Sequence, residues 1–137
     1  MEKMVTMDFT ILKEQFENKK VFVTGHTGFK GSWLLLILKE LGAKVVGYAL
    51  APENEADLFN QIDGAQYCEK SIIANILDAE QLKKEISAFQ PDYIFHLAAQ
   101  ALVRKSYENP IETYLVNTIG TANVLEAMLL LPNACVG

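Results

Sequence analysis

The segment Thr24-Gly25-His26-Thr27-Gly28-Phe29-Lys30-Gly31 is the strongest indicator of the fold in this chain. Before it, the short apolar run Val21-Phe22-Val23 predicts a buried strand. After it, apolar residues recur at helical spacing from Ser32 to Leu41, and Gly42 is a natural stop for that helix. A strand, a glycine-rich turn and a helix in this order are typical of the first unit of a nucleotide-binding α/β fold.

Three glycines in this turn have separate physical roles. Gly25 permits the tight turn, Gly28 lets the backbone approach a pyrophosphate, and Gly31 lets the helix pack close to the sheet. The helix N-terminus adds free amide groups and the positive end of a dipole. The strand–turn–helix context favours dinucleotide binding over a merely structural turn. Lys30 fits a phosphate contact and a solvated helix start equally well, and His26 is expected to be a loop residue rather than a catalyst.

The rest of the chain alternates short apolar strands with amphipathic helices, which predicts a Rossmann-type α/β fold: a parallel sheet of order 3-2-1-4 with helices on both faces. Residues 1–137 are expected to form a single, partial domain. The tail 131–137 does not read as a strand, so the sheet is predicted to stop before a fifth strand. Further strands are expected at Lys44 to Ala49, Tyr67 to Ile73 and Tyr93 to Leu97, and helices at 8 to 17, 78 to 90 and Pro110 to Leu130.

Caps and apolar spacing support the helices. Asp8 is a plausible N-cap, and Asp78 with Gln81 fits a capping box. The last helix carries a single apolar stripe, formed by Ile111, Leu115, Ile119, Ala122, Leu125 and Leu129.

Composition narrows the function classes. The 137 residues carry a net charge of -5 without a long basic block, which argues against a nucleic-acid surface. Apolar runs are too short for a membrane span, and the N-terminus lacks a secretory pattern, so a cytoplasmic protein is expected. Cys68 and Cys135 could form a disulfide, but two reduced thiols are expected in that compartment. No metal site is predicted.

The choice of nucleotide depends on the end of the second predicted strand. An acid that would bind the ribose hydroxyls belongs near Ala49, and none is present there. Glu53, Glu55 and Asp57 come too late to be assured substitutes. A 2′-phosphate would require a basic residue, and no Lys or Arg occurs between residues 45 and 69. The sequence therefore favours NAD.

Several sequence blocks resemble the extended short-chain dehydrogenases, and in particular the CDP-glucose 4,6-dehydratase family. His26-Thr27-Gly28-Phe29-Lys30-Gly31-Ser32-Trp33 is similar to that family's version of the glycine turn. Gly47-Tyr48-Ala49-Leu50-Ala51-Pro52 resembles its second strand. Further similar blocks are Phe95-His96-Leu97-Ala98-Ala99-Gln100, Leu102-Val103-Arg104-Lys105-Ser106-Tyr107 and 110–121, so the resemblance spans most of the chain.

The resemblance implies a set of site residues. Asn117 would support the loop after the fourth strand, and Gln100 and Arg104 would lie near the sugar-nucleotide substrate. Asn75-Ile76 stands where the family commonly has Asp-Ile, and the asparagine oxygen could still accept a hydrogen bond from adenine. The full implied cofactor set is Gly25, His26, Thr27, Gly28, Phe29, Lys30, Gly31, Asn75, Ile76, Leu97, Ala98, Ala99, Gln100 and Asn117.

The resemblance also implies chemistry that this chain lacks. In the family, a Tyr-x-x-x-Lys pair and a Ser/Thr with Asp-Lys convert CDP-glucose to a 4-keto-6-deoxy sugar, through hydride transfer to NAD, loss of water and return of the hydride. No tyrosine here has a lysine four residues later, so no catalytic residue is assigned and the chain alone is expected to be inactive. Self-association through the last helix or the edge strand is expected.

Two alternatives stay open at this stage. One is a non-catalytic NAD-binding or assembly module, and the other is a related nucleotide-sugar epimerase or dehydratase. The sequence does not distinguish a naturally short chain from a cut one.

Overall fold

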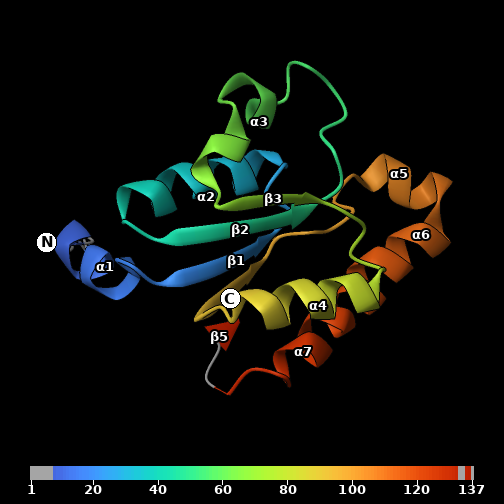
Figure 1. Cartoon of the computed structure of the whole chain (residues 1–137). Helices are drawn as coiled ribbons and strands as arrows, with labels where there is room; N and C mark the ends of the chain where they lie inside the picture. The colour runs from blue at the N-terminus through green and yellow to red at the C-terminus, as the bar shows by residue number, and fades with distance from the viewer. Residues whose placement is uncertain (1–7, 133–134, 137) are drawn as a thin grey trace, which may run out of the picture.

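Five parallel strands form the centre of the computed structural model, which describes residues 8–132 and 135–136 (Figure 1). Their order is β3-β2-β1-β4-β5. The strand bounds are β1 Lys20–Thr24, β2 Lys44–Ala49, β3 Lys70–Ile73, β4 Tyr93–His96 and β5 Cys135–Val136. The predicted order 3-2-1-4 is confirmed.

Helices cover both faces of the sheet, as the long buried runs of β1 and β2 require. On one face, α2 (Phe29–Glu40) and α3 (Leu58–Gln61) pack over Val21 and Val23. On the other face, α4 (Ala79–Phe89) and α7 (Gly120–Met128) pack over residues such as Phe22 and Ile94. Successive β1 residues therefore point into two separate cores, because side chains alternate across a strand. The other helices are α1 Phe9–Phe16, a 3₁₀ turn Gly64–Tyr67, α5 Val103–Glu108 and α6 Pro110–Tyr114.

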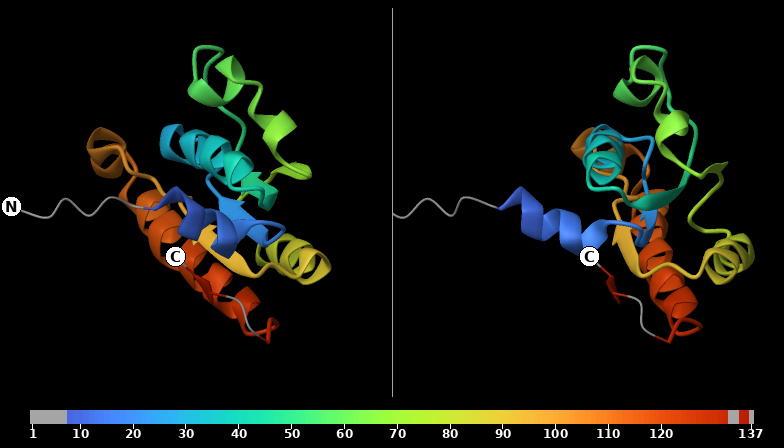
Figure 2. Two further views of the ribbon diagram at one scale, coloured as in Figure 1. Left: turned by 90° about the vertical axis from the view of Figure 1, so that its left-hand side faces the viewer. Right: turned by 60° about the vertical axis from the view of Figure 1, so that its left-hand side comes forward.

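The helix predicted from Pro110 to Leu130 is present but irregular. Figure 2 shows α6 and α7 as parts of one rod, joined by the π-helical segment Leu115–Ile119. Single π turns inside α-helices are frequent at functional sites. The buried residues of α7, which face the core, are Gly120, Val124 and Ala127. The predicted apolar stripe is the exposed side of the rod, where Leu129 is 84% exposed.

The end of the sheet differs from the prediction. The tail was expected to contain no strand, but Cys135 pairs with Tyr93 and Val136 with Ile94 in parallel register. The free edge of β4 offers backbone groups at this point, and two residues are enough to begin pairing. The expectation that the sheet stops before a fifth strand is therefore corrected, and β5 shields the first half of the β4 edge.

Other boundaries shift by a few residues. α2 begins at Phe29 rather than Ser32, and β3 begins at Lys70, after the 3₁₀ turn that occupies the predicted strand start. Both predicted N-caps are confirmed, since Asp8 Oδ1 accepts from the Thr10 N–H at 2.9 Å and Asp78 Oδ1 from the Gln81 N–H at 3.1 Å. The short helices α3 and α5 were not predicted.

Two further observations concern single residues and hydropathy. Cys68 is a half-buried free thiol whose pKa is raised to about 11 by burial, so it is protonated at neutral pH. The side chain of Cys135 lies outside the described part. Across residues 8–132 and 135–136, no helix combines the length and apolarity that crossing a bilayer demands.

Candidate dinucleotide-binding site

The glycine turn is held against the carboxyl ends of β1, β2 and β4. Gly25 has a φ of +76°, which favours glycine, and its N–H donates to the Tyr48 carbonyl at 2.9 Å. A side chain at Gly25 would meet the Leu97 carbonyl carbon at 2.6 Å. A side chain at Gly31 would collide with the Gly25 carbonyl oxygen. Both glycines are therefore required by close approach of backbone to backbone.

His26 anchors this turn to the neighbouring strands β2 and β3. Its ring is completely buried, its Nε2 lies 2.7 Å from Ser71 Oγ of β3, and it packs edge-on against Phe59. Gly47 of β2 makes room for it, because a Cβ there would overlap the ring. Burial lowers the pKa of His26 to about 4, and the Tyr48 backbone opposes this shift only in part. Among the described residues, Nδ1 has no hydrogen-bond partner of regular geometry. Because the pKa is about 4, the ring is neutral at pH 7.

Two adjoining cavities open beside the turn, with volumes of about 320 and 920 Å³. The smaller lies between the turn, the end of β2 and the segments after β3 and β4. The larger extends from the turn to α5 and α6. The smaller cavity includes Gly25, Thr27, Gly28, Ala49, Asn75, Ile76, Leu97, Ala98 and Ala99 among its lining residues. The larger shares Thr27, Gly28 and Ala99 and adds Phe29, Gln100 and Lys105 among others.

Polar contacts shape the smaller cavity. Thr27 Oγ1 donates to the Leu50 carbonyl at 2.8 Å, which ties the turn to the loop after β2. The Tyr48 hydroxyl donates to the Asn75 carbonyl at 3.1 Å, and the pKa of Tyr48 is raised to about 12, mainly by burial. Asn75 Oδ1 accepts from the Leu77 N–H at 2.9 Å. An amide oxygen has two lone pairs, so Asn75 keeps capacity for one further donor.

A chain of hydrogen bonds connects the end of β4 to the last helix. Thr24 Oγ1 accepts from the Ala98 N–H at 3.2 Å and lies 2.6 Å from His96 Nδ1. On the other side of the ring, His96 Nε2 lies 3.0 Å from Thr121 Oγ1, which donates to the Asn117 carbonyl at 2.8 Å. Each hydroxyl has one proton, so Thr24 donates to Nδ1 and His96 carries its proton on Nε2. Burial lowers the pKa of His96, in agreement with this neutral form.

Asn117 clamps the loop after β4. Its Oδ1 accepts from the Gln100 N–H at 2.8 Å, and its Nδ2 donates to the Gln100 carbonyl at 3.0 Å. Asn117 lies in the π-helical segment. Asn117 therefore contacts the loop after β4 but does not line either cavity itself, and its predicted role beside a cofactor stays a prediction.

Replacing Asn117 with leucine should free this loop. Two hydrogen bonds of about 1 kcal/mol each are lost, so exchange of the Gln100 amide hydrogen should accelerate by about tenfold or more. Hydrogen exchange followed by NMR measures this directly. Thr118→Ala, at an exposed position of the same segment, is the control and should leave that exchange rate unchanged. Equal protection of Gln100 in Asn117→Leu and the unsubstituted protein would contradict the assignment.

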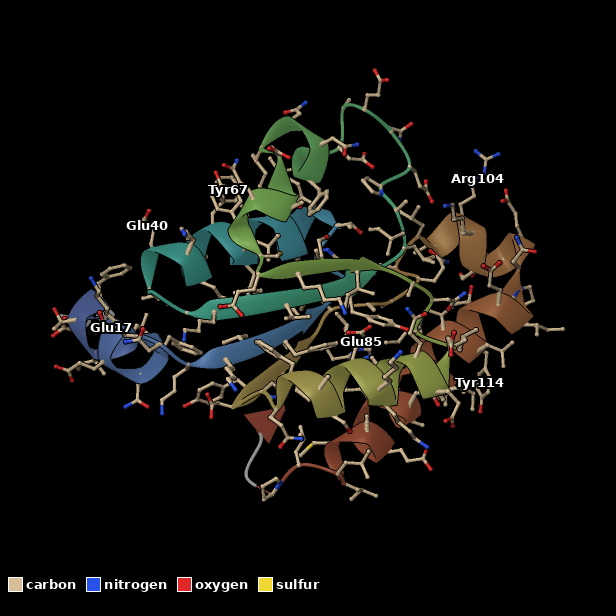
Figure 3. The ribbon with its side chains drawn as sticks, in the orientation of Figure 1. Glu17, Glu40, Tyr67, Glu85, Arg104 and Tyr114 are labelled. Atoms are coloured by element: carbon tan, nitrogen blue, oxygen red, sulfur yellow. The ribbon has the colours of Figure 1, made fainter. Side chains whose placement is uncertain are left out.

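The structure brings most of the predicted residues together around the two cavities, but five residues line neither of them: Asn117, His26, Gly31, Lys30 and Arg104. His26 and Gly31 are buried behind the turn, and Lys30 is exposed outside the cavity linings. Arg104 is 92% exposed, pairs with Glu108 at 3.0 Å, and points away from the body of the molecule in Figure 3. No described contact connects Arg104 to a cavity.

Sequence reasoning missed one contact across the larger cavity. Lys105 Nζ lies 2.8 Å from Glu53 Oε1, and both residues line that cavity. The two are far apart in sequence, and α5 was not predicted. Consecutive residues such as Arg104 and Lys105 point to different sides of a helix. If α5 had been predicted, Lys105 would have been a candidate for the cavity side of that helix.

A parallel sheet with a glycine turn and cavities at the carboxyl ends of its strands is the architecture of a Rossmann-type fold. The family model for GDP-mannose 4,6 dehydratase matches residues 22–135. The chain belongs to that family.

Individual relatives agree with this assignment. The chain is 51% identical to a CDP-glucose 4,6-dehydratase of Salmonella typhimurium over 85% of its own length and 32% of the relative. This confirms the resemblance predicted from the sequence blocks. The chain spans about a third of the length of the curated relatives it matches.

Solved structures agree on the fold. An epimerase from Methanothermobacter thermautotrophicus superposes with a TM-score of 0.74 at 30% identity, covering 93% of this chain and 37% of that one. A UDP-glucose 4-epimerase from Brucella ovis in complex with NAD superposes with a TM-score of 0.72 at 26% identity, covering 86% and 34%.

Proposed function

We propose that this chain binds NAD in the smaller cavity and at its junction with the larger one. The carrying observation is the glycine turn that opens onto both cavities: Gly28 lines them, and its Cβ position is open apart from the Gly25 carbonyl oxygen at 3.3 Å. A diphosphate would bind to the amides of this turn and to the N-terminus of α2. The NAD complex of the Brucella ovis epimerase supports the choice of cofactor.

The neighbouring residues fit the two ends of such a ligand. The adenosine end would lie against Ala49, Asn75 and Ile76, and Asn75 keeps a lone pair for an amino group. The nicotinamide end would lie toward Leu97, Ala98 and Ala99, whose backbone the Thr24 and Asn117 contacts hold in place. NAD would supply reversible hydride transfer when bound.

The charges of the lining favour NAD over NADP. Glu53 and Asp57 line the cavity beyond β2, whereas no basic side chain occurs among the described residues that line the smaller cavity. A 2′-phosphate would therefore be repelled near the ribose. A ribose with a free 2′-hydroxyl, as in NAD, fits this acidic lining better than a ribose with a 2′-phosphate, as in NADP.

For the whole protein, we propose a CDP-glucose 4,6-dehydratase of nucleotide-sugar and lipopolysaccharide biosynthesis, in which this chain provides the NAD-binding part. The 51% identity with the Salmonella typhimurium dehydratase supports this choice over an epimerase. The substrate would be CDP-glucose, with Gln100 at the larger cavity as a contact. A cytoplasmic location and self-association through the exposed stripe of α6 and α7 stay predictions.

Titration calorimetry of the purified chain tests the proposal. NAD should bind with a dissociation constant in the micromolar to millimolar range, and NADP should bind about tenfold more weakly because of the acidic lining. CDP-glucose incubated with the chain and NAD should remain unchanged, since no Tyr-x-x-x-Lys pair is present. Absence of NAD binding by a folded chain would refute the cofactor assignment, and dehydration of CDP-glucose would refute the assigned lack of activity.

A further inference from the structure

A single basic side chain, that of Lys105, occurs among the described residues that line the larger cavity. Among the described residues that line the two cavities, Lys105 alone has a basic side chain, whereas Glu53, Asp57, Glu108 and Glu112 are acidic. The turn residues Thr27 and Gly28 line the same cavity as Lys105. Glu108 is paired with Arg104 outside the lining, so Lys105 is the one basic side chain among the described lining residues that could compensate the charge of a phosphate at the turn.

Lys105 is held over this cavity by Glu53. The two side chains are 44% and 72% exposed and meet at 2.8 Å, so the ion pair joins α5 to the loop after β2. Figure 1 places this loop and α5 at the same edge of the sheet. The hydrogen bond that Lys105 donates to Glu53 is the largest cause of the raised pKa of Lys105, which keeps the ammonium charged. Exposed ion pairs of this kind are weak and exchange readily.

The loop that holds Glu53 is itself well ordered by local contacts. Asp57 Oδ2 accepts from the N–H groups of Glu53 and Asn54 at 2.9 and 3.1 Å. Thr27 connects the same region to the turn through Leu50. Glu53 therefore needs only a side-chain rotation to release Lys105, with no change in the backbone.

We propose that Lys105 binds phosphate oxygens of the nucleotide diphosphate at the glycine turn, and that Glu53 occupies Lys105 until such a ligand enters. This inference rests on the proposed function and deepens it. Its ligand class is a nucleoside diphosphate, either free or as part of NAD. Binding exchanges one carboxylate partner of Lys105 for a phosphate and leaves the Glu53 carboxylate to solvent.

The two partners should then have opposite effects on affinity. Lys105→Gln should weaken binding of both ADP and NAD about tenfold, because a charged hydrogen bond to phosphate is lost. Glu53→Gln should tighten both about threefold, because it removes a competing partner and a repelling charge. Lys105→Arg should restore most of the affinity. Lys39→Gln removes the same charge from an exposed position in the last turn of α2, outside both cavity linings, and should change nothing.

Calorimetric titration of ADP, NAD and NADP into each variant measures these effects. The three substituted residues carry partly or largely exposed side chains, so urea unfolding should give equal stabilities and exclude misfolding as a cause. Unchanged affinity in Lys105→Gln, or shifts of equal sign in Lys105→Gln and Glu53→Gln, would overturn the inference. A loss confined to NADP would also overturn it, since Lys105 would then serve a 2′-phosphate. If ADP responds as expected while NAD does not bind, the inference stands and the cofactor assignment fails.

Discussion

Replacing Gly31 with alanine should destabilise the fold by about 3 kcal/mol or more, a large fraction of the stability of a domain of this size. The added methyl group would collide with the Gly25 carbonyl oxygen and lie 2.8 Å from the His26 Cα. Both obstacles are backbone atoms of the turn, so no side-chain rotation relieves the clash. The turn or the start of α2 must move. Urea unfolding followed by circular dichroism measures the loss.

Two matched glycine variants separate this clash from other effects. In Gly42→Ala the φ of +75° is strained, but the nearest atom is Glu17 Cγ at 3.4 Å, so about 1 kcal/mol should be lost. Gly28→Ala, at a φ of -74°, should cost little stability yet weaken NAD binding, because its methyl group enters the cavity beside the turn. Equal stabilities of Gly31→Ala and Gly28→Ala would contradict the assignment of Gly31 to close packing.

The second large effect is a loss of stability in acid caused by His26. The folded pKa of about 4 lies below the ordinary value of 6.5, so between these values the unfolded chain binds the proton that the folded chain refuses. The contribution of neutral His26 to the free energy of unfolding is complete above pH 6.5 and is lost as the pH falls toward 4. It amounts to about 3 kcal/mol. Unfolding free energies measured from pH 7 to pH 4 would give this slope.

Variants at His26 isolate this slope from that of other groups. His26→Gln keeps an amide near Ser71, and His26→Ala leaves a cavity beside Gly47 and Phe59, so their stabilities at pH 7 should differ. Neither side chain titrates, and both variants should lose about 3 kcal/mol less than the unsubstituted protein on acidification. His96, whose pKa is lowered too, remains in all three. Identical acid slopes in the three proteins would contradict a buried neutral His26.

Local patterns were sufficient to predict the first four strands and the glycine turn. The runs at β1 and β2 are mostly buried and apolar, and the apolar run at β4 is half-buried around Ile94. Glycine or proline lies close to an end of each run, so hydrophobic pattern and chain-breaking residues agree. The glycine spacing predicted which side of the turn faces the cavities and which side packs against the sheet. Lining by Ala49, Leu97 and Ala98 could be anticipated because parallel strands end at one edge of the sheet.

Long-range contacts could not be predicted in this way. The role of His26 depends on a missing side chain at Gly47 and a hydroxyl at Ser71, in two other strands. The Lys105 contact depends on the bend that α5 introduces after Leu102, where the sequence has no strong periodicity. The resemblance indicated Arg104 by its position in a motif, but the direction of a side chain on a six-residue helix requires the coordinates.

The burial of the His26 ring in the gap left by Gly47 has a kinetic consequence. The turn is attached to β2 through Tyr48 and to β3 through Ser71, so the chain itself provides both anchors. A preorganised recess loses little conformational entropy on association, and its encounter rate is governed by diffusion and orientation rather than by loop ordering. Stopped-flow association should therefore rise linearly with nucleotide concentration, without the plateau that a slow rearrangement imposes.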